Sequence, residues 1–133
     1  MNHKETLMNY RLQQAQETIL EIDTMIKEKF STRSIINRSY YAMFYAILAL
    51  FIKYNITINT SKHSGIITIF DKEFIKNGII DITYSKILHK IFNYRLESDY
   101  KEFVTIQFDE AIELANNAKE FVNMIQKIII NQS

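Results

Sequence analysis

Hydrophobic residues recur every three or four positions along most of the chain, which is the spacing that gives an α-helix one apolar side. The chain has no proline and only two glycines in 133 residues, so little interrupts this pattern. The pattern predicts an all-α fold with helices over about residues 6–30, 32–54, 62–77, 82–97 and 109–130. Short connections indicate an antiparallel up-and-down bundle of four to five helices. We expect one domain, residues 1–133, with its core over about residues 6–130.

Small polar residues and a glycine mark the expected helix ends. Ser31, Ser61 and Asp81 precede the second, third and fourth predicted helices, where their side chains can accept the first free backbone N–H groups. Gly78 follows the third helix and suits a left-handed stop.

The second predicted helix is apolar on more than one side. From Tyr40 to Ile52 it has no charged side chain, which is too short for a membrane span of about 20 residues, so a core helix is predicted. One broad stripe can pack into the bundle: Ile36, Tyr40, Met43, Phe44, Ile47, Leu48, Leu50 and Phe51. The other face holds Arg38, Tyr41, Ala42, Tyr45, Ala49 and Ile52. We expect this second face to meet a second copy in a homodimer, in preference to full burial, with Ala42, Ala46 and Ala49 allowing close approach.

Composition limits the chemistry. The chain has no cysteine, so disulfides and thiolate metal sites are excluded, and the N-terminus lacks the features of a signal peptide. A cytoplasmic location is expected, with no membrane association. No histidines or carboxylates have metal-ligand spacing, and no P-loop or serine-hydrolase motif occurs, so no metal or cofactor is expected.

Charge is unevenly placed although the net charge is only +1. No acidic residue lies between Glu28 and Asp71, whereas several cations do: Lys29, Arg33, Arg38, Lys53 and Lys62. On an apolar face, Arg38 needs a partner, either a carboxylate from elsewhere in the fold or a phosphate-bearing ligand. Tyr45 follows two helical turns later and shares its surface.

Other polar residues are weaker candidates. Ser39 and Tyr41 closely follow Arg38 in sequence and are candidate ligand-binding residues. His63, near the start of the third helix, is another candidate, although a capping or packing role is simpler for this histidine. Arg95, Asp99 and Tyr100 cluster where the fourth helix ends, which favours an Arg–Asp clamp that pins the connection.

Several strings in this order carry a family resemblance: "NRSYYAMFYAILAL", "KHSG", "IFDKEFI", "YSKIL", "YRLESDY" and "AIELANNAKEFVNMI". Over about residues 6–130 they resemble the HEPN domain superfamily, and more narrowly its small stand-alone prokaryotic branch associated with minimal nucleotidyltransferases. The resemblance implies a four- to five-helix bundle, usually homodimeric, that binds or cuts RNA. In such toxin–antitoxin pairs the HEPN protein is commonly the toxin and the nucleotidyltransferase the antitoxin.

The ribonuclease signature of this superfamily is an arginine, four to six residues, then a histidine. Arg38 matches the arginine, but Met43, Phe44 and Tyr45 stand at the three histidine positions. In this branch the histidine often falls where Tyr45 stands, and a tyrosine with a reference pKa of about 10 is a poor base. Alternatively, taking Met43 as the histidine position makes Tyr45 the tyrosine that, in some of these toxins, receives AMP from the nucleotidyltransferase. The sequence leaves both alignments open.

Two functions therefore stay open, with the first favoured. One is a HEPN dimer that keeps Arg38 but has lost the histidine, and partners a nucleotidyltransferase or binds RNA or nucleotide without cutting. The other is a metal-independent toxin endoribonuclease in which Arg38 acts with Tyr45 or His63. A third, purely structural interpretation has Arg38 ordering its own interface.

Overall fold

The computed structural model describes residues 2–100 and 106–131, with only the backbone for residues 97–100. This part of the chain forms α-helices and one short π-helix and has no strand. Their bounds are α1 (His3–Lys27), α2 (Thr32–Lys53), α3 (His63–Phe70), the π-helix η1 (Asp71–Ile75), α4 (Ile82–Tyr100) and α5 (Phe108–Asn131). The all-α prediction is confirmed.

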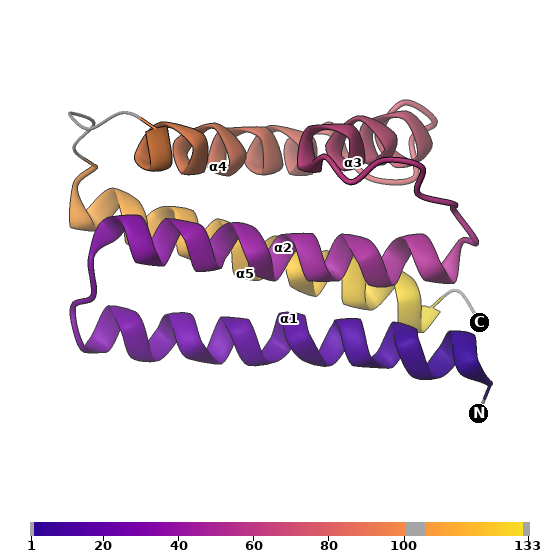
Figure 1. Cartoon of the computed structure of the whole chain (residues 1–133), viewed down its shortest axis with the longest axis horizontal. Helices are drawn as coiled ribbons and strands as arrows, with labels where there is room; N and C mark the ends of the chain where they lie inside the picture. The colour runs from indigo at the N-terminus through magenta and orange to yellow at the C-terminus, as the bar shows by residue number, and fades with distance from the viewer. Residues whose placement is uncertain (1, 101–105, 132–133) are drawn as a thin grey trace.

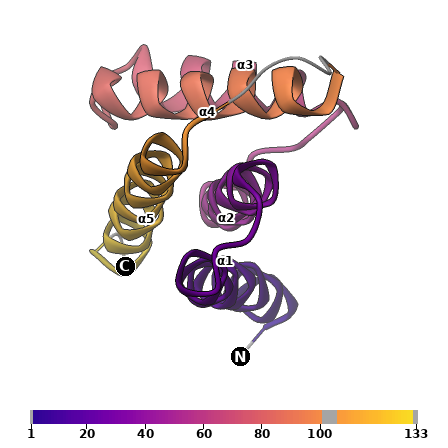
Figure 2. The same ribbon diagram turned by 90° about the vertical axis from the view of Figure 1, so that its left-hand side faces the viewer.

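The helices form three layers with α2 in the middle. In Figures 1 and 2, α3 and α4 lie on one side of the layer that holds α2 and α5, and α1 lies on the other side. α2 packs against α1, α5 and α4. Successive long helices reverse direction, so that α1 begins and α5 ends at the same end of the bundle, opposite the turn between α1 and α2 (Figure 1).

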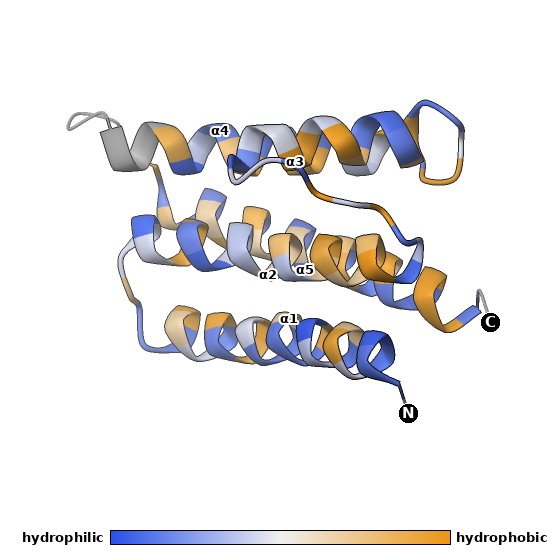
Figure 3. Ribbon diagram, turned by 45° about the vertical axis from the view of Figure 1, so that its right-hand side comes forward, coloured by the Kyte–Doolittle hydropathy of each residue, from blue (hydrophilic) through white to orange (hydrophobic). Residues whose placement is uncertain are grey.

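The core is built around α2. Among the described helices, only α2 is long and apolar enough to cross a membrane, yet 61% of its most apolar stretch is buried inside the bundle. In Figure 3 hydrophobic residues dominate its C-terminal half. The core-helix prediction therefore agrees with the packing.

The expected role of the alanines in α2 is wrong. Ala42, Ala46 and Ala49 have no exposed surface, because they pack inside the bundle. Their small side chains allow neighbouring helices of the same chain to approach α2 closely. A narrower half-buried stripe runs along α2 between α1 and α4: Arg38, Tyr41, Phe44, Tyr45, Leu48 and Ile52.

Two of the three predicted N-caps and the glycine stop are confirmed. The Ser34 backbone N–H donates to Ser31 Oγ at 3.1 Å, and the Thr83 N–H donates to Asp81 Oδ2 at 2.9 Å. Gly78 has a φ of 79°, a left-handed conformation that glycine adopts without strain.

Ser61 is not the cap of the third helix, which begins two residues later at His63 and has no side-chain cap. Thr60 orders this entry instead, since its Oγ1 accepts the Lys62 N–H at 3.1 Å. A Cβ at Gly65 would lie 2.6 Å from Thr60 Cγ2, so only glycine fits there without a shift of Thr60. The polar contact predicted for this helix entry is therefore made by Thr60 and not by Ser61.

The third predicted helix also changes form before it ends, because α3 passes into η1 at Asp71. The Asp71 carboxylate accepts the Ser85 hydroxyl at 2.7 Å and pairs with His89 Nε2 at 2.6 Å. These contacts fasten the wider π turn to α4.

Candidate functional site

The site begins at the turn between α1 and α2. Lys29 has a φ of 55°, its N–H donates to the Ile26 carbonyl at 3.1 Å, and the Phe30 N–H donates to the Met25 carbonyl at 2.8 Å. This pair of bonds is the Schellman motif that closes many helices, and it places Phe30 beside Met25. Although the turn is ordered in this way, Phe30 remains 50% exposed.

Arg38 reaches back from α2 to α1. Its Nη2 donates to the two carboxylate oxygens of Glu21 at 3.2 and 3.4 Å, and to Thr18 Oγ1 at a long 3.5 Å. The partner carboxylate thus comes from another helix, as its absence near Arg38 in the sequence required. The Arg38 side chain is 31% exposed, and its Nε atom is buried with no hydrogen-bond partner among the described residues.

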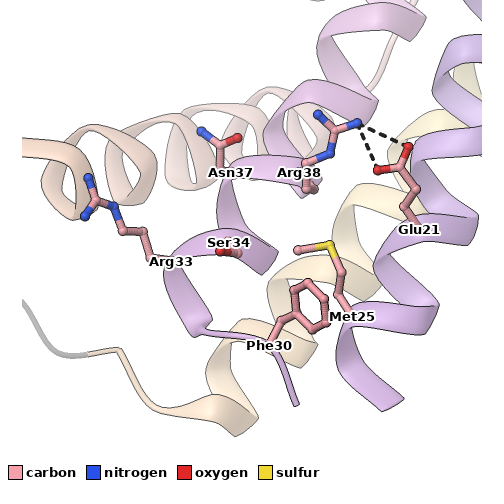
Figure 4. A pocket seen from close by; sticks show the side chains of 7 residues that line it. All are labelled: Glu21, Met25, Phe30, Arg33, Ser34, Asn37 and Arg38. Carbon is pink, nitrogen blue, oxygen red and sulfur yellow. Dashed lines mark hydrogen bonds and ion pairs between the residues drawn. The ribbon is translucent and has the colours of Figure 1, made fainter. Parts of the chain in front are cut away.

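Among the described residues, Arg38 lines a larger and a smaller hollow. The larger, of about 410 Å³, also has Glu21 on its wall and is shown in Figure 4. Its remaining lining residues are Met25, Phe30, Arg33, Ser34 and Asn37. We call this hollow the Arg38 pocket.

The smaller hollow, of about 120 Å³, lies on the other side of Arg38 and brings in Tyr45. Its other lining residues are Gln14, Glu17, Thr18 and Glu21. We call it the Tyr45 pocket. The predicted shared surface of Arg38 and Tyr45 is therefore present in the fold.

The three residues that stand at the histidine positions of the signature differ in solvent exposure. Met43 has no exposed surface and belongs to the core. Phe44 is half-buried and packs on His63, with ring centroids 4.3 Å apart. Of the three, only Tyr45 lines a pocket with Arg38.

Ser39 is wrongly predicted as a ligand-binding residue. It has no exposed surface, and its hydroxyl donates to the Ile35 carbonyl at 2.7 Å. Ser39 follows Arg38 in sequence, but one residue along a helix is a turn of about 100°, which carries its side chain into the core.

His63 and Tyr41 belong to an aromatic cluster on the α4 side of α2. His63 Nδ1 is hydrogen-bonded to the Tyr40 hydroxyl at 3.0 Å. The Arg95 guanidinium lies over the Tyr40 and Tyr41 rings, 5.0 and 5.4 Å from their centroids. His63 lines neither the Arg38 pocket nor the Tyr45 pocket.

Burial determines the protonation of this cluster. It raises the pKa of Tyr40, which has no exposed surface, so the phenol keeps its proton. Burial, and then the nearby Arg95 charge, lower the pKa of His63. His63 is therefore neutral at pH 7 and acts as a packing and hydrogen-bonding residue.

The predicted clamp of Arg95, Asp99 and Tyr100 cannot be followed in full, because the side chains of Asp99 and Tyr100 lie outside the described residues. Arg95 is described, and its contacts include the rings of Tyr40 and Tyr41 in α2. The clamp stays a prediction.

The contributions of α1 and of the turn were not foreseen from the sequence. Glu21 supplies the carboxylate to Arg38, and Phe30 forms a wall of the larger pocket. A weak signal for Glu21 was present, since Gln14, Glu17 and Glu21 follow one another at helical spacing. In the part of the chain that the structure describes, no three His, Asp or Glu side chains gather closely enough to hold a metal ion.

Comparison with known proteins identifies the family of this chain. The family model described as "HEPN domain" matches residues 8–128. The UPF0332 protein of Thermotoga maritima is 31% identical over 97% of this chain and 96% of its own length.

Two proteins of Methanocaldococcus jannaschii are also similar. "Putative toxin MJ0142" is 30% identical over 92% of this chain and 81% of its own length. "Putative toxin MJ0605" is 33% identical over 73% of this chain and 70% of its own length. Because the family model and the Thermotoga relative each span nearly the whole helical bundle, the chain belongs to the HEPN domain family.

Proposed function

We propose that this HEPN protein is the toxin-like member of a toxin–antitoxin pair, a cytoplasmic homodimer that binds RNA or a nucleotide phosphate at Arg38 without cutting it. Its partner would be a nucleotidyltransferase. The observation that carries this proposal is the Arg38 guanidinium, half-buried between two pockets, with Tyr45 on the side where a ribonuclease of this superfamily would hold its histidine. The names of the two Methanocaldococcus relatives agree with a toxin-like protein.

Binding is favoured over cleavage because a proton-transfer group is missing. Cleavage of RNA without a metal requires a group that takes the 2′-hydroxyl proton and a cation that stabilises the phosphorane. Arg38 can act as the cation, but Tyr45 is a weak base and His63 packs against Phe44 on the other side of the stripe. The burial of Met43 supports the alignment in which Tyr45 takes the histidine position.

The half-buried stripe on α2 supports a homodimer. It continues from Arg38 along α2 through Tyr41, Tyr45 and Leu48, and its side chains are mainly apolar. In a two-fold dimer through this stripe, the same residues of both copies would face each other, so two Arg38 side chains would border one cleft.

An RNA assay tests the choice between binding and cleavage. Purified protein is incubated with labelled transfer RNA and messenger RNA in the presence of a chelator, and both binding and strand scission are measured. We expect binding that Arg38→Ala weakens by about ten-fold or more, because a charge-assisted contact to phosphate is lost. Scission by the wild type that Arg38→Ala abolishes would establish the endoribonuclease alternative instead.

A gain-of-function variant tests the missing histidine directly. Tyr45→His completes the signature in the only one of its three positions that lines a pocket with Arg38. We expect this variant to cut RNA without metal, and the double variant Arg38→Ala/Tyr45→His to be inactive. If Tyr45→His stays inactive while it binds RNA normally, the loss of the histidine does not explain the absence of cleavage.

Tyr45 remains a candidate for modification with AMP. Its half-buried side chain lines an open pocket. Co-expression with a nucleotidyltransferase encoded beside this gene, followed by mass spectrometry, should show one added AMP that Tyr45→Phe removes. An AMP group on another residue, or none, would contradict this assignment.

A further inference from the structure

We propose that the Arg38 pocket holds one unstacked base of a single-stranded RNA, with the base against Phe30 and its phosphate at Arg38. This inference rests on the proposed RNA binding at Arg38 and adds a second contact, to the base, that this binding does not require. It makes Phe30 a recognition residue.

The aromatic wall of the pocket is ordered before any ligand arrives. The Schellman hydrogen bonds hold the Phe30 backbone, and Met25, which is 8% exposed, lies beside it in the pocket wall (Figure 4). The large aromatic residues of the core are fully buried, whereas Phe30 is 50% exposed. An exposed aromatic ring is what single-strand binding proteins use to stack bases, and its stacking is tolerant of sequence.

The opposite wall carries charge and an amide. Arg38 and Arg33 come from α2 and line the same hollow as Phe30, and Asn37 lies between them in sequence. The described hydrogen bonds of Arg38 all run through Nη2, which leaves its Nη1 group for a phosphate. Guanidinium groups bind phosphate with paired N–H donors, and an asparagine amide can reach the edge of a base.

The local charge and the size of the pocket favour a nucleotide over a peptide or other protein segment. Between Lys29 and Lys62 the chain has no acidic residue, so Glu21 of α1 is the carboxylate on the pocket wall. The volume of about 410 Å³ lies within the range of about 300–1,000 Å³ that small-molecule sites occupy. A base that is stacked within an RNA duplex cannot reach such a wall, which restricts the ligand to single strands.

Fluorescence anisotropy with a labelled RNA of about ten nucleotides tests the base contact, since single-strand sites span about 4–16 nucleotides. Phe30→Ala should weaken binding about ten-fold through lost stacking, and Phe30→Trp should preserve or tighten it. Tyr10→Ala is the matched control, because Tyr10 is an aromatic residue of α1 with 54% exposure that lines neither pocket at Arg38. It should bind as the wild type does.

A strand that lacks its bases separates the two contacts. The abasic strand should bind the wild type about ten-fold more weakly than the intact RNA does, and it should bind Phe30→Ala and the wild type equally. Arg38→Ala should weaken both strands and reduce the salt dependence of binding, which Phe30→Ala should leave unchanged.

The outcomes distinguish the two levels of the proposal. If Arg38→Ala weakens RNA binding while both Phe30 variants bind like the wild type, the base pocket is refuted and the proposed function stands. If the wild type binds no RNA, both are refuted. Thermal unfolding of each variant checks that it folds. Should Phe30→Ala unfold, the wild type alone still decides the matter, because equal binding of the intact and the abasic strand would refute the base pocket.

Discussion

The Arg38 guanidinium already forms an ion pair with the Glu21 carboxylate. A phosphate that approaches Nη2 must compete with Glu21, whose side chain is 55% exposed. Ion pairs exposed to this degree contribute about 0–1 kcal/mol, so the competition is weak but measurable. Glu21 is therefore expected to set the strength of phosphate binding rather than the stability of the fold.

Glu21→Gln should tighten RNA binding by up to about five-fold, which corresponds to about 1 kcal/mol, because the amide does not compete for the guanidinium as a carboxylate does. Titrations at one fixed salt concentration measure this change, and urea unfolding should shift by less than about 1 kcal/mol.

Glu17→Gln is the control for overall charge. Glu17 also lines the Tyr45 pocket, but its Oε1 accepts a hydrogen bond from Gln13 Nε2 at 3.0 Å. An equal gain in affinity for Glu17→Gln and Glu21→Gln would mean that net charge, and not the pairing with Arg38, is responsible.

At the level of the helices, His63 fastens the start of α3 to α2. Its ring packs on Phe44 and is hydrogen-bonded to Tyr40, while Arg95 stands over the Tyr40 ring. Burial of the ring, and then the nearby Arg95 guanidinium, disfavour the protonated imidazolium in the native state. The described groups that face His63 from α2 and α4 thus include a cation and aromatic rings.

Stability should consequently depend on pH. Because the pKa of His63 is lowered in the native state from an ordinary value of 6.5, the unfolded chain binds more protons below about pH 6.5, and stability is lost as the pH falls through that value toward the native pKa. Urea unfolding between about pH 8 and pH 5 should show this decline in the free energy of unfolding.

His63→Gln should flatten the profile in that window, and His3→Gln, at the exposed start of α1, should leave it unchanged. A profile for His63→Gln that matches the wild type would show that other groups cause the decline.

The sequence predicted helix ends best where the chemistry is local. Asp81 and Gly78 act within two or three residues of their own position, so their roles follow from residue type. Ser61 is the exception, since the neighbouring Thr60 accepts the Lys62 N–H and residue type alone does not decide between the two. The prediction for the alanines of α2 failed because their burial depends on where other helices pack. Periodicity showed that α2 has two apolar faces, but not which face other parts of the same chain cover.

Ala46→Leu should lower the free energy of unfolding by about 1–3 kcal/mol, because Ala46 has no exposed surface and the added carbons must displace packed neighbours. Urea unfolding monitored by circular dichroism measures the loss at a concentration where the wild type is monomeric. Unchanged unfolding together with a lost dimer would restore the intermolecular role that the sequence pattern favoured.

For the whole molecule, the half-buried stripe on α2 is the surface to test for assembly. Leu48→Glu places a charge in the middle of the stripe and should convert a homodimer to a folded monomer, because an unpaired charge at an apolar interface is costly. Light scattering after size-exclusion chromatography measures the mass.

Leu20→Glu is the matched control, since Leu20 is 66% exposed on α1 and lies outside the stripe. A wild type that is monomeric at all accessible concentrations, or equal dissociation by both variants, would contradict a dimer through α2.

At the scale of the whole molecule, the contribution of α2 to the site could be predicted from the sequence, whereas the contribution of α1 and its turn could not. Arg38 and Tyr45 lie two helical turns apart on one helix, so their common surface followed from the helical repeat alone. Glu21 and Phe30 belong to the preceding helix and its turn, and their approach to Arg38 depends on how α1 folds back on α2. Contacts between helices of this kind are fixed by the packing of the whole bundle.

The placement of the chain ends has a practical consequence for all of these experiments. The start of α1 and the end of α5 lie at the end of the bundle opposite the α1–α2 turn that carries Phe30 (Figure 1). A fluorophore, purification tag or surface anchor attached beyond the start of α1 or the end of α5 is thus separated from the Arg38 pocket by most of the length of a helix. Immobilised protein should therefore bind RNA as freely as the untethered chain does.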